Sequence, residues 1–132
     1  MRGVVVISPV GRGSYVLVVD DIPESREVIV EVLEIYGYTA VGASSGKEAL
    51  EYLHQSPPPR LIITDLMMPV MNGWDFLDAK RKIKHLSNVP VLVLSAIPEP
   101  KVEADHVMLK PVDIDMLLTV IKPYAGDRPG EE

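Results

Sequence analysis

Five polar side chains stand directly behind four short apolar segments of the chain. They are Asp20 and Asp21, then Asp65, Ser95 and Lys110. Each apolar segment has the composition of a buried parallel strand, and the carboxyl ends of parallel strands lie along one edge of a sheet. Any one of these residues could serve simply as a turn or helix cap. Their joint placement predicts instead that they converge at one site.

The chemistry of this set is phosphoryl transfer onto a carboxylate. Asp20, Asp21 and Asp65, brought within about 4–5 Å, would repel by roughly 3–4 kcal/mol per pair at an effective dielectric near 20, so they need a cation. Oxygen ligands without nearby histidine or cysteine suit Mg²⁺, or Mn²⁺ as the alternative, better than zinc. A carboxylate beside such a cation can attack phosphorus, while the Lys110 ammonium and the Ser95 hydroxyl bind the transferred oxygens.

The elements that must position these residues form a doubly wound α/β fold. Short apolar segments rich in β-branched residues alternate with stretches of helix length, which is the pattern of βαβ units around a parallel sheet. The five predicted strands are residues 16–19, 39–41, 61–63, 91–94 and 107–109.

Four helices are predicted between and after these strands. The first runs from Pro23 to about residue 36 and the second begins at Ser44 or Ser45, where a serine can cap it. The third is capped by Asn72, and the last spans about 113–121, capped by Asp113 and stopped near Pro123. We expect the first helix to bury Val28, Val32, Ile35 and Tyr36, and the third to turn Lys80, Arg81, Lys82 and Lys84 outward.

Length and charge limit the classes of function. The chain of 132 residues fits one domain, with 47% hydrophobic and 24% charged residues, as in ordinary globular proteins. Its net charge of −6 opposes direct binding to nucleic acid, and it has no cysteines for disulfides or zinc. The apolar run Val4–Ile7 ends at Ser8, too short for a signal peptide or a membrane span, so we expect a cytoplasmic protein.

Four stretches of the sequence resemble the receiver domains of bacterial response regulators, in the order usual for that family. They are VLVVDD, LIITDLMMPVMNGWDFL, PVLVLSA and LKP, within about residues 15–122. The spacing agrees as well, because Asp21 precedes Asp65 by 44 residues, Ser95 follows Asp65 by 30, and Gly73 follows it by eight.

The resemblance implies a fold, a site and a signalling role. The fold would be flavodoxin-like, with the strand order 2-1-3-4-5. Asp65 would be the phosphoacceptor, with Mg²⁺ held by Asp20, Asp21, Asp65 and the backbone carbonyl of Met67. Ser95 and Lys110 would contact the phosphoryl group, and the Lys110–Pro111 peptide bond would be cis.

A neighbouring class, the haloacid-dehalogenase type of phosphatase, also uses an aspartate nucleophile and Mg²⁺ on a parallel sheet. It needs a second aspartate two residues after the nucleophile to act as general acid. Ile22 and Met67 stand at that offset from Asp20 and Asp65, so the sequence does not favour a phosphatase.

The chain departs from the receiver pattern after Ser95. Only nine residues separate Ala96 from His106, fewer than a helical crossover needs, and Pro98 and Pro100 disfavour a helix there. We therefore expect the fourth helix of the usual receiver fold, which lies between the fourth and fifth strands, to be absent or about one turn long. Val107 stands where receivers usually carry a switching Tyr or Phe, and the adjacent His106 is either a substitute or an ordinary surface residue.

Two further positions bear on the lifetime of a phosphorylated form. By the resemblance, residues two beyond the phosphoacceptor and two beyond the hydroxyl residue govern how water reaches the acyl phosphate. Met67 and Ile97 stand there, and neither side chain can orient water through a hydrogen bond. We expect slow hydrolysis.

The expected protein is thus a stand-alone receiver that accepts phosphate from a histidine kinase or phosphotransfer protein and signals by binding a downstream target protein. It would not be a turnover enzyme, and a homodimer remains open. The alternative is a pseudo-receiver that binds partners constitutively without switching. We expect a receiver domain over 15–124, a disordered tail over 125–132 and a flexible leader over 1–14, although Val4–Ile7 within the leader could add a strand to a sheet edge.

Overall fold

A five-stranded parallel sheet forms the centre of the protein, whose computed structural model describes residues 15–125. The strand order is β2-β1-β3-β4-β5, as the resemblance implied. Neighbouring strands pair nearly in step, with Val16 opposite Leu61 and Ile62 opposite Val91. The strands are β1 (Tyr15–Val19), β2 (Thr39–Ala43), β3 (Leu61–Asp65), β4 (Val91–Ser95) and β5 (His106–Leu109).

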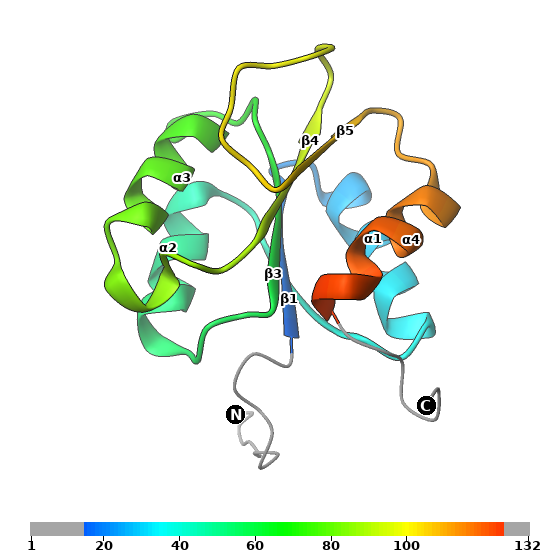
Figure 1. Ribbon diagram of the computed structural model, residues 1–132, viewed down its shortest axis with the longest axis horizontal. Helices are drawn as coiled ribbons and strands as arrows, with labels where there is room; N and C mark the ends of the chain where they lie inside the picture. Colours follow the sequence, from blue (N-terminus) through cyan, green and yellow to red (C-terminus); the bar gives the residue numbers. More distant parts are fainter. Residues whose placement is uncertain (1–14, 126–132) are drawn as a thin grey trace.

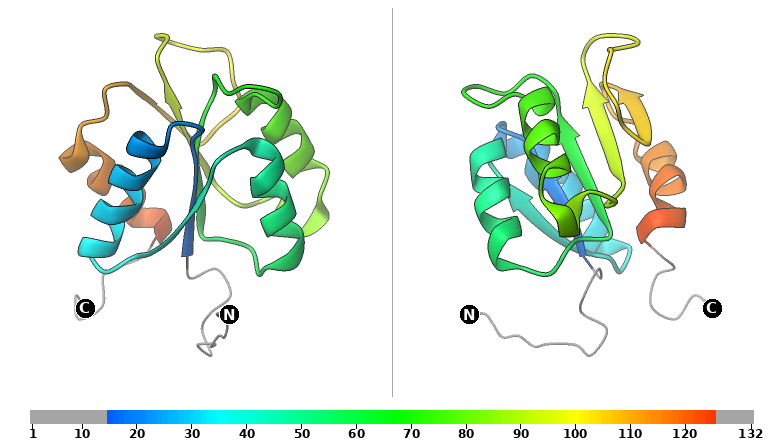
Figure 2. Two further views of the ribbon diagram at one scale, coloured as in Figure 1. Left: turned by 180° about the vertical axis from the view of Figure 1, so that it is seen from behind. Right: turned by 60° about the vertical axis from the view of Figure 1, so that its left-hand side comes forward.

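Helices cover both faces of the sheet, which confirms the doubly wound class. Helices α2 and α3 lie on one face, and α1 and α4 lie on the other (Figures 1 and 2). A short 3₁₀ turn, Lys84–Leu86, follows α3. The helices are α1 (Pro23–Ile35), α2 (Gly46–Gln55), α3 (Gly73–Arg81) and α4 (Ile114–Ala125).

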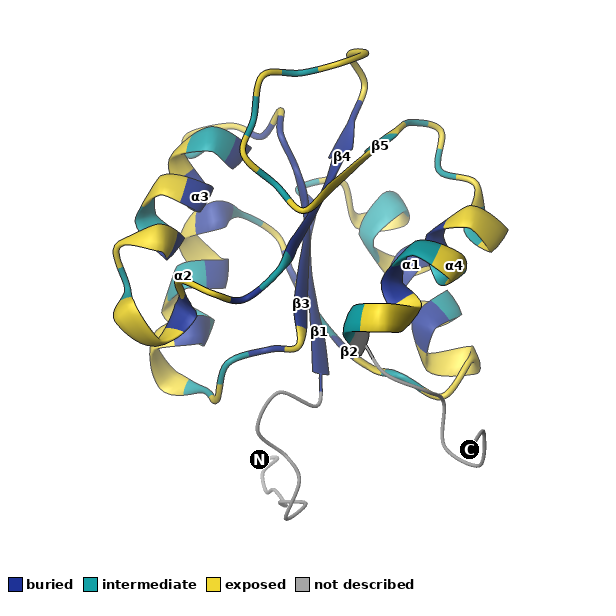
Figure 3. Cartoon of the chain, viewed as in Figure 1, coloured by how far each residue is buried: buried dark blue, intermediate teal, exposed yellow. Residues whose placement is uncertain are grey.

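The core consists of two apolar layers separated by the sheet. Every residue of β1, β3 and β4 is buried, so the central strands appear dark blue throughout in Figure 3. Alternate side chains of one strand enter opposite layers: Leu17 packs toward α2 and α3, whereas Val18 packs toward α1 and α4. Burial on both faces explains why these strands lack polar alternation.

Three helix caps predicted from the sequence are present. The Ser45 hydroxyl accepts a hydrogen bond from the amide of Glu48 at 3.0 Å, which fixes the start of α2. Asn72 Oδ1 accepts from the amide of Asp75 at 2.9 Å at the start of α3. The Asp113 carboxylate caps α4 in the same way. Each bond satisfies an amide that the first helical turn leaves without a partner.

The prediction of which face of α1 is buried is wrong. The helix buries Ile29 and Leu33, whereas Ile35 is 75% exposed and Val28 is also exposed. Two apolar stripes run along α1, offset by one residue and therefore by about 100° around the helix axis. The sequence pattern alone does not choose between them, because the choice depends on how the turn after β1 directs the helix onto the sheet.

Two further predictions about helices are corrected. Lys80 does not face outward with the other basic residues but is 5% exposed, with its Nζ donating to the carbonyl of Ser87 at 3.2 Å. Its long aliphatic stem packs on the core while the ammonium group reaches a backbone acceptor. Helix α4 is not stopped by Pro123 but continues to Ala125. A proline in the last turn removes only one backbone hydrogen bond, so the helix tolerates it.

The segment between β4 and β5, residues 96–105, contains no helix, as predicted. It forms the yellow loop in Figure 1, and hydrogen bonds hold it to α3 and to the start of β4. Trp74 Nε1 on α3 donates to the carbonyl of Lys101 at 2.8 Å, and Asp105 Oδ1 accepts from the amide of Val91 at 2.8 Å. Without a covering helix, β5 leaves Val107 and Leu109 exposed.

Some expectations concern residues that the structure does not describe. The leader over 1–14, including Val4–Ile7, lies outside the described residues, as do residues 126–132 of the tail. Among the helices of residues 15–125, none has the length and apolar character needed to cross a lipid bilayer.

Candidate phosphoacceptor site

Three carboxylates meet at the carboxyl edge of the sheet. Asp20 and Asp21 follow β1, Asp65 ends β3, and the two strands are neighbours. One oxygen from each side chain lies within 4.8 Å of the other two. Asp20 and Asp65 are buried, whereas Asp21 is half-buried, so the cluster opens to solvent on one side. The convergence predicted from the strand ends is therefore present.

The oxygens of Asp20 fit a bound cation. Asp20 Oδ1 accepts a hydrogen bond from the amide of Ile22 at 2.9 Å. Asp20 Oδ2 is buried and has no hydrogen-bond partner among the described residues. A buried carboxylate oxygen without a partner is costly, and a hard divalent cation among three carboxylates would supply the missing interaction. The residues present thus suit Mg²⁺.

Lys110 brings a positive charge to the same edge. It follows β5, and its Nζ lies 2.9 Å from Asp65 Oδ1. The backbone amide of Lys110 donates to the carbonyl of Ser95 at 2.8 Å, which extends the pairing of β4 and β5 to the site. The Lys110–Pro111 peptide bond is cis, as the resemblance implied.

The surroundings of the two buried carboxyls, Asp20 and Asp65, oppose ionisation of both at once. Burial, together with the adjacent Asp20, raises the pKa of Asp65 to about 7, although Lys110 partly offsets this. Burial also acts upward on the pKa of Asp20, but the nearby side chains of Asp65 and Ser25, the amide of Ile22 and the charge of Lys110 outweigh it and lower that pKa. Without a cation, Asp65 therefore carries a proton below about pH 7, while Asp20 is ionised.

Ser95 reaches the site from β4, but its hydroxyl is engaged elsewhere. The Ser95 hydroxyl donates to the carbonyl of Ile97 at 2.6 Å and accepts from the amide of Ile97 at 3.0 Å. Both bonds hold the first residues of the segment that follows β4. To donate to a ligand beside Asp65, the hydroxyl would have to release the carbonyl of Ile97.

Gly73 allows α3 to begin close behind Asp65. A Cβ at this position would lie 2.5 Å from the carbonyl oxygen of Asp65 and 2.7 Å from Cα of Leu66, so no other residue fits without a backbone shift. The amide of Gly73 donates to the carbonyl of Leu66 at 2.7 Å. This contact gives a physical reason for a glycine eight residues after Asp65.

Three apolar side chains in the segments that follow β3 and β4 are exposed. The side chains of Met67 and Ile97 are exposed, and Val70 is fully exposed.

Arg26 is a neighbour of the acidic cluster that the sequence did not single out: its Nη1 donates to the carbonyl of Asp20 at 2.9 Å. No sequence motif marks an arginine for this contact, because it depends on the direction in which α1 leaves the site.

Fold and site together define a class of protein. It is a doubly wound α/β domain in which one sheet edge carries three carboxylates, a lysine and a serine. The family model of the response regulator receiver domain matches residues 16–122. The chain belongs to this family, whose members act in two-component signalling as phosphoacceptors rather than as turnover enzymes.

Curated relatives come from both plants and bacteria. The rice two-component response regulator ORR11 (Oryza sativa subsp. indica) is 32% identical over 123 residues, which cover 86% of this chain and 84% of the relative. ORR7 of Oryza sativa subsp. japonica is 36% identical over 105 residues, covering 74% of this chain and 50% of the relative. The CpxR homolog of Haemophilus influenzae, a transcriptional regulatory protein, is 34% identical, with 83% of this chain matching 49% of it. The chain thus spans only about half the length of two of these relatives.

Solved structures agree with the fold. The chemotaxis protein CheY4 of Vibrio cholerae superimposes with a TM-score of 0.78 at 30% identity, covering 84% of this chain and 98% of that one. A response regulator receiver protein from Pseudomonas putida gives a TM-score of 0.76 at 32% identity, covering 86% and 99% of the two chains.

Proposed function

We propose that Asp65 accepts a phosphoryl group in a Mg²⁺-dependent reaction and that the phosphorylated domain signals by binding another protein. The phosphoryl donor is a phosphohistidine on a histidine kinase or a phosphotransfer protein. We assign the receiver unit to residues 15–124 and expect it to act in the cytoplasm, with no direct contact to nucleic acid. The proposed metal ligands are Asp20, Asp21, Asp65 and the backbone carbonyl of Met67.

Each residue of the site has a distinct part in the transfer. An Asp65 carboxylate oxygen attacks phosphorus, the phosphorus–nitrogen bond of the donor breaks, and its electron pair returns to the imidazole, which takes up a proton. The Lys110 ammonium and the Ser95 hydroxyl stabilise charge on the transferred oxygens. Mg²⁺ held by Asp20, Asp21 and Asp65 would supply further charge neutralisation, and its charge would favour the ionised form of Asp65 that attacks phosphorus.

The observation that supports this proposal most strongly is the placement of Lys110. Its Nζ lies 2.9 Å from Asp65 Oδ1, one of the two buried members of the carboxylate cluster, whereas Asp21 is half-buried. A lysine that merely neutralised the cluster could pair with the more exposed Asp21 at lower desolvation cost. Pairing with the buried Asp65 supports its proposed role as the phosphoryl acceptor, because the transferred group would bring its negative charge to this position.

A second candidate function is a pseudo-receiver that binds its partner constitutively. Its support is the absence of a helix over residues 96–105 and the exposed valine, Val107, on β5. A valine has no ring that could swing inward when Ser95 moves. Binding of the partner would then be independent of the state of Asp65.

The phosphorylated form should be long-lived. Met67 and Ile97, two residues beyond Asp65 and Ser95, have exposed apolar side chains that offer no group to orient a water molecule toward an acyl phosphate. We expect hydrolysis over many minutes or longer, which can be followed by phosphate release after labelling with a small phosphodonor. A half-life of seconds would contradict this expectation.

One experiment separates the two candidate functions. The full chain is incubated with Mg²⁺ and acetyl phosphate, and its intact mass and amide chemical shifts are followed, with Asp65→Asn as the control. An adduct in the wild type alone, together with shifts far from the site, is the expected result. An adduct without distant shifts would favour the pseudo-receiver, and no adduct would reject the phosphoacceptor.

A further inference from the structure

Arg26 lies one turn into α1, and its side chain folds back toward the end of β1. Its Nη1 donates to the backbone carbonyl of Asp20 at 2.9 Å. That carbonyl belongs to the peptide group that joins Asp20 to Asp21. The hydrogen bond therefore fixes the plane from which both acidic side chains project.

The remaining groups of Asp20 are fixed by other elements. Its amide donates to the carbonyl of Ala43 on β2 at 3.1 Å, and its Oδ1 accepts from the amide of Ile22 at 2.9 Å. With Arg26 on the carbonyl, only Oδ2 lacks a hydrogen-bond partner within the described part of the chain. The surrounding bonds thus leave a single oxygen of Asp20 for a ligand.

The strand beside Arg26 leaves room for its side chain. A Cβ on Gly42 of β2 would lie 3.1 Å from Cδ and 3.3 Å from Cγ of Arg26, closer than most packed Cβ atoms. Glycine is a poor strand former, so its presence inside β2 needs a reason. The aliphatic stem of Arg26 occupies the space that a larger residue would fill.

We infer that Arg26 is a positioning residue of the metal site: it holds the Asp20–Asp21 peptide so that both carboxylates bind Mg²⁺ together. This inference rests on the proposed function, because it concerns affinity for the cation that phosphoryl transfer needs. Outer residues that orient metal ligands typically change affinity by about 10–100-fold when removed. A purely electrostatic role predicts the opposite sign, since a nearby positive charge repels Mg²⁺ and its removal would tighten binding.

The test measures the Mg²⁺ dissociation constant of the unphosphorylated full chain by titration calorimetry. Arg26→Met keeps the aliphatic stem but removes the donor, and it should weaken binding about tenfold. Gly42→Val keeps the arginine and its charge but displaces the stem, and it should weaken binding several-fold. Arg26→Lys, which keeps a donor group of different shape and reach, should fall between the wild type and Arg26→Met.

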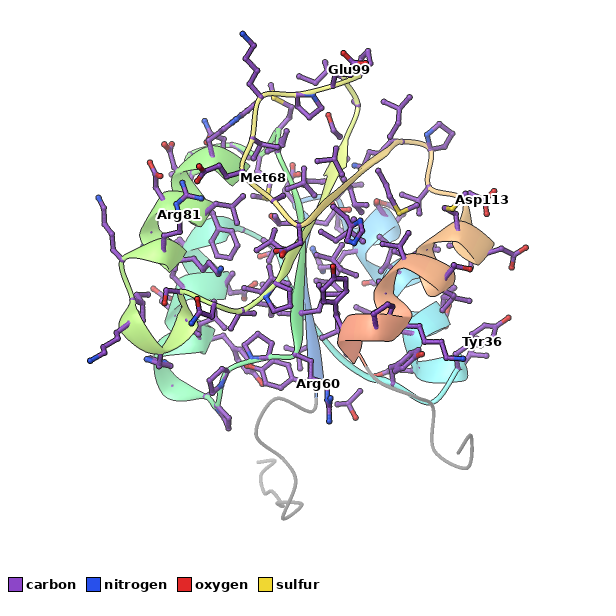
Figure 4. All side chains as sticks on the ribbon, viewed as in Figure 1. Tyr36, Arg60, Met68, Arg81, Glu99 and Asp113 are labelled. Carbon is purple, nitrogen blue, oxygen red and sulfur yellow. The ribbon has the colours of Figure 1, made fainter. Side chains whose placement is uncertain are left out.

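The matched control is Arg60→Met, which changes net charge equally at the end of the sheet far from the site. Figure 4 labels Arg60 at the start of β3, at the bottom of the view. This variant should bind Mg²⁺ as the wild type does. Urea unfolding of each variant checks that it is folded at the titration temperature. If Arg26→Met does not fold, Gly42→Val alone tests whether Arg26 positions the metal ligands.

The outcomes distinguish this inference from the proposed function. Unchanged or tighter binding in both Arg26→Met and Gly42→Val, with normal binding in the wild type, would overturn the role of Arg26 and leave the proposed function intact. A wild type that binds no Mg²⁺ would overturn the metal-dependent function and the inference with it. Weaker binding in both variants, with Arg60→Met unchanged, supports the inference.

Discussion

At Asp65, two interactions of opposite sign set the behaviour of the site. Burial and the neighbouring Asp20 raise the pKa of Asp65 to about 7, while Lys110, 2.9 Å away, favours the ionised form. In the unfolded chain an aspartate releases its proton near pH 4. Without a cation the folded state therefore binds more protons than the unfolded state between about pH 4 and pH 7, and stability falls as pH rises through that window.

Replacing the carboxyl of Asp65 should remove this loss of stability. Asp65→Asn is expected to unfold at a higher urea concentration than the wild type in EDTA at pH 8, by about 2–4 kcal/mol in free energy of unfolding. The difference should become small near pH 4, where Asp65 is protonated in the folded state and about half-protonated in the unfolded chain. An equal difference at pH 4 and pH 8 would show that the buried charge is not its cause.

The residues of the site were predictable because their positions follow from the sheet. Asp20, Asp65 and Ser95 end or follow buried strands, and parallel strands bring their carboxyl ends together whatever lies between them. The sequence could not predict that the Ser95 hydroxyl binds Ile97, or that Arg26 reaches the carbonyl of Asp20. Both contacts depend on loop conformation and helix direction, which no local pattern encodes.

At the scale of the elements, the sequence predicted where a helix can form better than it predicted which face of a helix is buried. Prolines and a short connection predicted the missing helix over residues 96–105, because proline geometry acts within the segment itself. The buried face of α1 was predicted wrongly, because Val28 and Ile29 belong to two apolar stripes of similar quality. Only packing against β1 and β2 decides which stripe turns inward.

The turn between β3 and α3 contains a strained residue. Val70 has a φ of 68° and is fully exposed, so a β-branched side chain occupies the left-handed region without packing in return. Val70→Gly should stabilise the protein by about 1 kcal/mol, because relief of the left-handed strain exceeds the entropic cost of glycine. Thermal unfolding tests this, with Val70→Ala as the control that should change little; a less stable glycine variant would contradict the expectation.

The segment over residues 96–105 is hydrogen-bonded both to Ser95 and to α3. Its start is held by the Ser95 hydroxyl and its middle by Trp74 Nε1, which donates to the carbonyl of Lys101. If Ser95 turns to a phosphoryl group, the bond to the Ile97 carbonyl is lost and the segment loosens. Since Trp74 is the only tryptophan, its emission should change when Mg²⁺ and beryllofluoride are added.

Ser95→Ala provides the control for this fluorescence change. The variant lacks the hydroxyl that must exchange partners, so its emission should respond much less to beryllofluoride. Binding of the phosphoryl mimic is verified separately by fluorine NMR. An equally large emission change in Ser95→Ala would show that the segment does not respond through this hydroxyl.

At the scale of the whole molecule, the polar site lies at the carboxyl edge of the sheet, and the edge strand β5 is exposed. The carboxylates and Lys110 gather at the carboxyl edge, whereas β5 exposes Val107 and Leu109 on the face where no helix covers it. The net charge of −6 opposes unspecific attraction of the chain to nucleic-acid phosphates. The arrangement separates the proposed phosphoacceptor site from the exposed side chains of β5, which we propose as a surface for a protein partner.

The central claim is that Asp65 itself becomes phosphorylated, and chemical mapping of the modified residue tests it most directly. The full chain is treated with acetyl phosphate and Mg²⁺, then reduced with borohydride, which converts an aspartyl phosphate to homoserine. Peptide mass spectrometry then locates the change. We predict homoserine at position 65, dependent on Mg²⁺. Homoserine at position 20 or 21 instead, or none at any position, would contradict the claim.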